Sequence, residues 1–264
     1  PGPRAPGPRT PSRWIASTRV DDSPSFSRDG RRIAFSSDRS GSNQIWICDA
    51  ECGTATQLTD LEHGGAFTPS WSPDGRRIAF AVYQNNLPDI FVVEVETGRV
   101  RKLTNGLAYY AFPDWSPDGK WIYFDIENEH ILRIPAEGGE ATQVTTDIAM
   151  DAKSSHDGRY LYHLRSGETG IWRVSGEGGP STRIVDQGTW GHWGVYDRGL
   201  CYITTKEAPR AIECLDFQTK RVDRLTTIER NITQGFAVSP DGEWVLYSQE
   251  DLGGSDLVLV ENFR

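Results

Sequence analysis

The chain has 264 residues, 37% of them hydrophobic, and a formal net charge of −9 at pH 7. Such an acidic balance repels phosphate backbones and anionic lipid headgroups, and no stretch of 18 apolar residues occurs, so we expect no nucleic-acid contact and no membrane insertion by this segment. Nine tryptophans against a single methionine favour an all-β fold, because aromatic rings pack well on pleated sheets.

Residues 1–12 are rich in proline, glycine and arginine and are predicted to form an extended linker. They lack the apolar core of a signal peptide, and the first residue is proline. We therefore expect the chain to be a piece of a longer polypeptide.

A short signature, Ser-x-Asp-Gly, recurs along the chain, and its glycines follow one another at steps of 45, 44, 39, 41 and 43 residues. Five copies keep Asp-Gly, and the fifth in order has degenerated to Asp-Arg-Gly. The copies lie at 27–30, 72–75, 116–119, 155–158, 196–199 and 239–242. Proline presets φ at the second position of a type I turn, aspartate suits the third, and glycine takes the left-handed conformation that follows. Strand-like residues flank each copy, so each predicts a β-hairpin.

Two further strands are predicted after every hairpin. The third strands are expected at 44–48, 89–93, 130–134, 170–174, 211–215 and 256–260. The fourth strands are expected at 55–59, 100–104, 141–145, 181–185 and 222–226. No segment shows sustained helical periodicity. The sixth unit ends without a fourth strand, and residues 13–17 have the composition of one.

Four antiparallel strands in each of six units predict an all-β, six-bladed β-propeller over residues 13–264, with the N-terminal strand closing the last blade. The blades are expected at 23–59, 68–104, 112–145, 151–185, 192–226 and 235–261. Closure of the ring removes exposed sheet edges that would otherwise invite aggregation.

Ser-Pro-Asp-Gly followed by an aromatic-rich strand, together with the segment 37–46, resembles the TolB-like β-propeller repeat over residues 13–264. The ending 255–264 resembles the C-terminus of bacterial, often acidobacterial, proteins in which such a propeller follows a winged-helix DNA-binding domain, commonly with a membrane span between them. The resemblance implies a non-catalytic sensory or protein-interaction domain of a larger bacterial transcriptional regulator. It would be periplasmic or extracytoplasmic if a membrane span precedes it, and cytoplasmic otherwise.

Propeller geometry places the connections between blades on one face, and these connections are rich in aromatic residues. The candidate binding residues are Phe67, Tyr109, Tyr110, Phe112, Trp190, His192 and Trp193. Exposed loop aromatics are typical of binding hot spots, and the alternative is that they pack between blades. We expect a monomer that binds a protein or small-molecule ligand at this face.

The sequence predicts neither an enzyme nor a cofactor. The turn aspartates recur in every blade, which indicates turn stabilisation, since an active site needs a unique constellation. No Gly-x-Ser-x-Gly elbow occurs. The four cysteines, at 48, 52, 201 and 214, are too few for a disulfide scaffold and are expected to be structural thiols.

Two enzyme families remain as alternatives because their propellers are similar to this one. In prolyl-oligopeptidase-like peptidases such a propeller precedes a hydrolase domain, which this sequence does not contain. Oligogalacturonate lyases hold a metal in the channel with histidines. His63 and His192 are weak candidates for such ligands, because a zinc or manganese site needs three or four convergent groups and only two point to one place.

Overall fold

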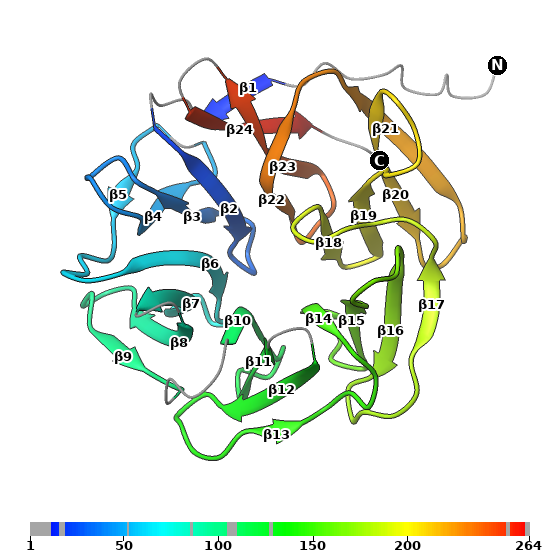
Figure 1. Cartoon of the computed structure of the whole chain (residues 1–264). Helices are drawn as coiled ribbons and strands as arrows, with labels where there is room; N and C mark the ends of the chain where they lie inside the picture. The colour runs from blue at the N-terminus through cyan, green and yellow to red at the C-terminus, as the bar shows by residue number, and fades with distance from the viewer. Residues whose placement is uncertain are drawn as a thin grey trace.

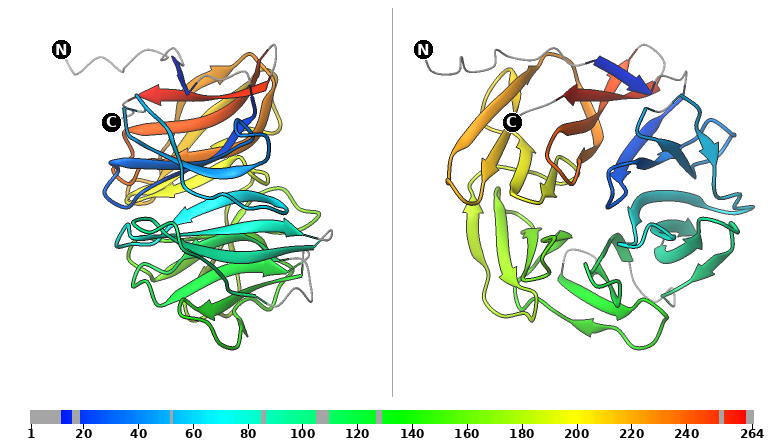
Figure 2. Two further views of the ribbon diagram at one scale, coloured as in Figure 1. Left: turned by 90° about the vertical axis from the view of Figure 1, so that its left-hand side faces the viewer. Right: turned by 180° about the vertical axis from the view of Figure 1, so that it is seen from behind.

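The computed structural model describes residues 12–15, 19–51, 53–84, 87–104, 110–126, 129–251 and 254–261. Their strands form six antiparallel sheets of four strands each, arranged as a ring (Figure 1), and the side view shows a flattened disc (Figure 2). The predicted six-bladed, all-β propeller is confirmed. Within the described ranges there is no helix of the length and apolarity that crossing a bilayer requires.

The strands follow one another outward from the channel in each blade. Blade one holds β2 (Asp21–Phe26), β3 (Arg32–Ser37), β4 (Gln44–Asp49) and β5 (Thr56–Gln57). Blade two holds β6 (Gly65–Trp71), β7 (Arg77–Gln84), β8 (Leu87–Glu94) and β9 (Val100–Lys102). Blade three holds β10 (Tyr110–Trp115), β11 (Trp121–Ile126), β12 (His130–Pro135) and β13 (Thr142–Gln143). Blade four holds β14 (Met150–Ser154), β15 (Tyr160–Leu164), β16 (Ile171–Ser175) and β17 (Thr182–Val185). Blade five holds β18 (Trp193–Tyr196), β19 (Gly199–Ile203), β20 (Arg210–Asp216) and β21 (Val222–Ile228).

Blade six is built from both ends of the chain. It holds β22 (Ile232–Val238), β23 (Trp244–Asp251), β24 (Gly254–Glu261) and, on its outside, β1 (Ser12–Ile15). β1 pairs antiparallel with β24, with Ser12 opposite Leu259. The Ser255 hydroxyl donates to the carbonyl oxygen of Asp21 at 3.0 Å, which ties blade six to blade one. The predicted closure is therefore confirmed, with the strand at 12–15 where 13–17 was expected.

The Ser-x-Asp-Gly turn is held by the same hydrogen bonds in five blades. In blade two the Ser72 hydroxyl donates to Asp74 Oδ1 at 2.6 Å and accepts from the Arg77 N–H at 2.9 Å. Asp74 Oδ1 also accepts from the Arg76 N–H at 3.0 Å, and Gly75 has φ 66°. This arrangement, called the turn lock below, recurs with serines 27, 116, 155 and 239 and aspartates 29, 118, 157 and 241. The turn aspartates thus stabilise turns, as predicted.

The innermost strands of five blades carry a β-bulge at one equivalent position. Ser23, Thr68, Phe112 and Asp151 have φ of 49–51°, and Gly235 has φ 144°. The pairing register between the first and second strands shifts at each of these positions. A bulge bends its strand, so these five strands share one curvature around the channel.

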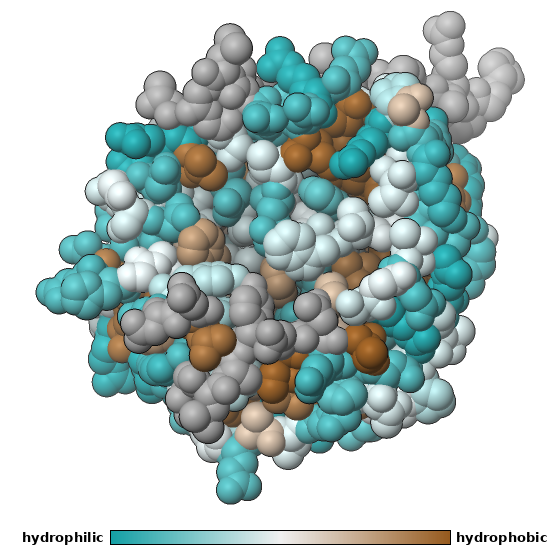
Figure 3. Space-filling model, in the orientation of Figure 1, coloured by the Kyte–Doolittle hydropathy of each residue, from teal (hydrophilic) through white to brown (hydrophobic). Residues whose placement is uncertain are grey.

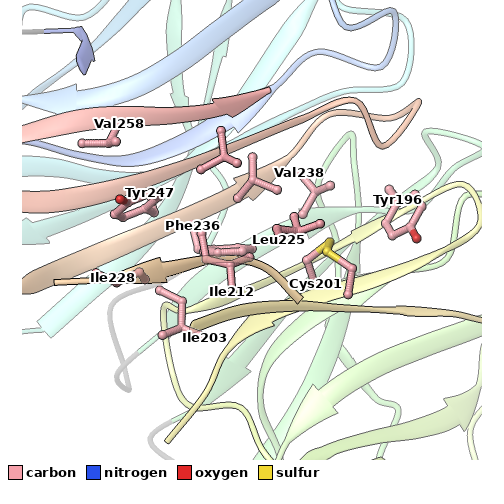
Figure 4. Close-up of a cluster of buried hydrophobic side chains, with 13 residues drawn as sticks. Tyr196, Cys201, Ile203, Ile212, Leu225, Ile228, Phe236, Val238, Tyr247 and Val258 are labelled. Carbon is pink, nitrogen blue, oxygen red and sulfur yellow. A yellow bond between two sulfur atoms is a disulfide. The ribbon is translucent and has the colours of Figure 1, made fainter. Parts of the chain in front are cut away.

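Neighbouring blades are joined by tryptophan and by apolar packing. Trp71 Nε1 donates to the Ser25 carbonyl at 3.1 Å, and Trp115 Nε1 donates to the Ser70 carbonyl at 3.1 Å. Arg32 lies 4.4 Å over the Trp71 ring, a cation–π contact across the same boundary. Between blades five and six a cluster of buried side chains fills the boundary (Figure 4). It includes Cys201, Ile203, Ile212, Phe236, Val238, Tyr247 and Val258.

Blade five departs from the repeat. Tyr196 pairs with Gly199, so only two residues form its turn, and β18 pairs with β19 without a register shift. Cys201 and Cys214 face each other on β19 and β20 and form a disulfide. Cys48 is disulfide-bonded as well, so the expectation of thiols is wrong for these three residues. For Cys201 and Cys214 the reason is register: two cysteines 13 residues apart become cross-strand neighbours, which spacing in the sequence does not reveal. Cys52 lies outside the described residues.

Candidate functional site

The centre of the ring contains a cavity of about 210 Å³ that is lined by the innermost strand of every blade. Pro24, Pro69 and Pro113 contribute to its wall beside the bulges. At one end the lining comes from the turns between first and second strands, including Arg28 and His156. At the other end it comes from residues near the connections between blades.

Phe112 and Trp190 form an aromatic pair at the connection end of the channel. Their ring centroids are 5.2 Å apart and their planes make an angle of 82°, an edge-to-face arrangement. Phe112 belongs to blade three and lines the cavity, whereas Trp190 lies in the connection from blade four to blade five. The pair thus spans the inner strand of blade four. Trp190 remains 40% exposed, which leaves much of its surface for a ligand.

The loop that carries Trp190 is held at its C-terminal side. The Gly191 N–H donates to Asp151 Oδ2 at 3.3 Å, and the Gly191 carbonyl accepts from the Gly235 N–H at 3.1 Å. Gly191 has φ 71°, and a Cβ there would lie 2.8 Å from the Gln234 side chain, so the loop needs glycine at this point. Trp190 is therefore presented on a fixed backbone, which lowers the entropy lost on binding.

The other predicted aromatic residues that the structure describes make contacts of their own. Phe67 packs edge-on against Tyr83 at 5.3 Å, and Tyr110 packs against Phe124 at 5.5 Å. Trp193 is fully buried, and its Nε1 donates to Asp151 Oδ2 at 2.8 Å. Tyr109 lies outside the described residues. Of the six predicted aromatic residues, the structure brings Phe112 and Trp190 together at the channel.

The histidines do not converge on a metal-binding geometry. His63 is exposed in the loop before β6. His192 is partly buried, with Nε2 3.1 Å from the Thr233 carbonyl, and burial lowers its pKa. Among the residues that the structure describes, no group of three or more His, Cys, Asp or Glu side chains could hold a metal ion.

Sequence reasoning missed a network of charged residues in one wall of the channel. Asp114 Oδ2 accepts from the Ser154 N–H at 2.8 Å and from the Ser154 hydroxyl at 2.6 Å. Lys153 Nζ lies 3.2 Å from Asp151 Oδ1. Burial raises the pKa of Asp114, and the Ser154 hydrogen bonds oppose this. Burial lowers the pKa of Lys153, but the carboxylates around it outweigh burial and the net direction is upward.

The signal for this network was present in the repeat. The residue two positions after the bulge is Ser25, Ser70 and Ala237 in blades one, two and six, but Asp114 and Lys153 in blades three and four. The opposite wall is apolar, with Phe236 and Val238 lining the cavity. The channel therefore offers a polar side and an apolar side to whatever enters it.

Apolar residues on the face seen in Figure 3 form separate patches between hydrophilic ones. No continuous apolar surface is visible in this view over the coloured residues. A partner on this face would therefore depend on a few anchor residues, as hot-spot interfaces do.

Comparison with known proteins identifies relatives of the fold. The family model described as TolB beta propeller domain matches residues 67–262. The model for the N-terminal region of dipeptidyl peptidase IV matches residues 27–106. No curated protein matches the chain.

Solved structures include two kinds of similar propeller. TolB from Acinetobacter baumannii is 20% identical with a TM-score of 0.71, covering 84% of this chain and 57% of that one, so the chain spans little more than half of that relative's length. An oligogalacturonate lyase in complex with manganese is 15% identical with a TM-score of 0.64, covering 97% of each chain. The oligogalacturonate lyase from Vibrio parahaemolyticus is 13% identical with a TM-score of 0.63, covering 96% of this chain and 93% of that one. At these identities the likeness concerns the fold.

Proposed function

Since the chain belongs to the TolB β-propeller domain family, we propose that it is a non-catalytic binding propeller, and that it holds a protein partner at the Phe112–Trp190 end of its central channel. The observation that carries the proposal is the exposed Trp190, paired with a cavity-lining aromatic residue on a fixed loop. The resemblance of residues 255–264 to bacterial regulators supports a role as their sensory or protein-interaction domain.

The size of the cavity favours a protein partner over a free small molecule. Pockets for drug-sized ligands usually enclose about 300–1,000 Å³, and this channel offers about 210 Å³. A side chain or a short end of a partner would fill such a space, while Trp190 contacts the partner's surface at the rim. Trp is among the residues that most often dominate binding energy at interfaces.

A metal-dependent lyase is the second candidate, because an oligogalacturonate lyase covers 97% of this chain. That lyase is described in complex with manganese. The described residues of the present chain do not fit such a site, since no three of their potential ligands converge and His192 Nε2 faces a backbone carbonyl. Incubation of the protein with manganese and oligogalacturonate is expected to leave the oligosaccharide intact, and its cleavage would favour the lyase.

Peptides selected from a random display library on the folded protein test the binding proposal. Trp190→Ala is expected to weaken the selected peptides on the order of tenfold or more, as loss of an aromatic hot spot does. Trp121→Ala is the matched control. Trp121 follows the turn at 116–119, on the face of the ring opposite to Trp190, and its ring stacks on Arg133. Equal affinity for the Trp190→Ala variant and the unmodified protein would refute the site.

A further inference from the structure

Two turns from opposite blades touch across the turn end of the channel. Arg28, in the turn of blade one, donates from Nη2 to the carbonyl oxygen of His156 in the turn of blade four at 3.0 Å. His156 Nδ1 in turn contacts Asp197 Oδ1 in the turn of blade five. In the ring of six, blades one and four face each other across the centre (Figure 1). Both Arg28 and His156 line the cavity.

The residues of this contact are departures from the repeat. The second position of the turn lock is proline in blades two, three and six, namely Pro73, Pro117 and Pro240. It is Arg28 in blade one and His156 in blade four. The proline side chain is short and has no donor, whereas the arginine side chain is long enough to cross and carries five donors. Arg28 reaches the main-chain carbonyl of residue 156, and the His156 side chain extends the contact to Asp197.

We propose that Arg28, His156 and Asp197 form a floor that closes the turn end of the channel, so that the channel is a one-ended socket open at the Phe112–Trp190 end. The proposal rests on the proposed function for its ligand. A socket of this kind fits the end of a polypeptide chain or one protruding side chain of the partner. A segment that threads through the ring does not fit it.

The floor is held by charge-assisted contacts. The guanidinium of Arg28 donates to a carbonyl, and this type of bond is stronger than one between neutral groups. His156 is mostly buried, with its side chain 19% exposed, and its contact with Asp197 fixes the orientation of the ring. Three blades therefore contribute to one closure, and Arg28 is the part that spans the gap.

Reaction of a thiol placed inside the channel measures the closure. Ser25 lines the cavity and is not one of the three residues of the floor, so Ser25→Cys places a thiol on the wall. The cysteines that the structure describes are disulfide-bonded, and the parent protein corrects for any other reaction with N-ethylmaleimide. Near-ultraviolet circular dichroism and the melting temperature check that each variant is folded.

Adding Arg28→Ala to Ser25→Cys is expected to raise the labelling rate about twofold, because the reagent then enters through both ends of the channel and not through the Phe112–Trp190 end alone. Arg31→Ala is the matched control, because Arg31 is exposed in the same turn, and it should leave the rate unchanged. Equal rates with and without Arg28→Ala would overturn the floor. Trp190→Ala should also raise the rate by widening the entrance, and an unchanged rate would overturn the assignment of the open end.

The labelling rates require no partner, so they are independent of the peptide experiment. Loss of the predicted peptide binding with a normal response to Arg28→Ala would reject the proposed function and leave the closed channel standing. Peptide binding that depends on Trp190, together with labelling insensitive to Arg28, would reject the socket alone.

Discussion

Blade five and the other five blades form the same four-stranded sheet by different means. The other blades hold their first hairpin with the Ser–Asp turn lock and bend the inner strand with a bulge. Blade five has a two-residue turn, no bulge, and the buried Cys201–Cys214 disulfide between its second and third strands. Blade five thus carries a covalent link between its second and third strands and lacks the hydrogen bonds of the turn lock between its first and second.

Residues that repeat from blade to blade serve the fold, and residues that depart from the repeat are available for function. Positions that repeat, such as Phe35, Phe80 and Phe124 on the second strands, are fully buried and equivalent. Positions that depart from the repeat gather at the channel. They include Asp114, Lys153, Arg28, His156, Asp197 and the Trp190 loop. Departures from local rules are expected at functional sites.

Removal of the Cys201–Cys214 disulfide should have the largest effect on stability. Cys201→Ala combined with Cys214→Ala is expected to lower the free energy of unfolding by about 2–5 kcal/mol, measured by urea denaturation. The link constrains the unfolded chain and fills the boundary between blades five and six (Figure 4). A loss no larger than that from removing one turn lock would contradict the role given to the disulfide.

Asp22 makes the stability of the protein depend on pH in a way that its equivalents in the other bulged blades do not. Asp22 is the residue immediately before the bulge of blade one. The equivalent residues of the other bulged blades do not ionise near neutral pH, and they are Phe67, Ala111, Met150 and Gln234. Burial raises the pKa of Asp22 to about 6, against the Ser23 hydrogen bond and with help from Asp21 and Asp38. The folded protein therefore holds a proton that the unfolded chain releases near pH 3.8, so this residue's contribution to stability falls as pH rises from about 4 to 6.

Asp22→Asn should remove that dependence. The variant is expected to be more stable than the parent above pH 7 by about 2–3 kcal/mol, the free energy that a shift of this size represents. Asp157, in the turn lock of blade four, acts in the opposite direction, because hydrogen bonds from Ser155 and Arg159 lower its pKa to about 2. Identical pH profiles for Asp22→Asn and the parent would show that Asp22 ionises normally.

Removing a single turn lock should lower stability by less than removing the disulfide. Ser116→Ala removes the hydroxyl that donates to Asp118 and accepts from the Trp121 N–H, and should destabilise the protein by about 1 kcal/mol in urea. Arg198→Ala, in the turn of blade five that has no lock, should change stability by less than about 0.5 kcal/mol, because Arg198 is exposed and its ion pair with Asp216 lies at the surface. Equal losses from the two variants would mean that the repeated turn is not what holds those blades.

The sequence was sufficient to predict the architecture because repetition multiplies a weak local signal. Each Ser-x-Asp-Gly copy alone indicates a turn, while six copies with strands between them indicate a closed ring and explain why β1 joins β24. The disulfide could not be predicted, since Cys201 and Cys214 become neighbours through strand register. Of the predicted binding residues, Trp193 is fully buried, while Phe67 and Tyr110 are half-buried and contact rings of neighbouring strands, and these differences depend on side-chain direction. The contact of Arg28 with His156 depends on the ring itself.

The separation of fold and function is tested most directly by substituting Trp190, which departs from the repeat, and Phe80, which repeats in other blades. Phe80→Leu, at a fully buried repeated position, should lower the free energy of unfolding by about 1 kcal/mol or more and leave the affinity for the selected peptides unchanged. Trp190→Ala should cost no more stability than its ring contact with Phe112 is worth, about 0.5–1.5 kcal/mol, and should weaken those peptides on the order of tenfold. Affinity that follows stability in both variants would contradict the separation of fold and function on which the account depends.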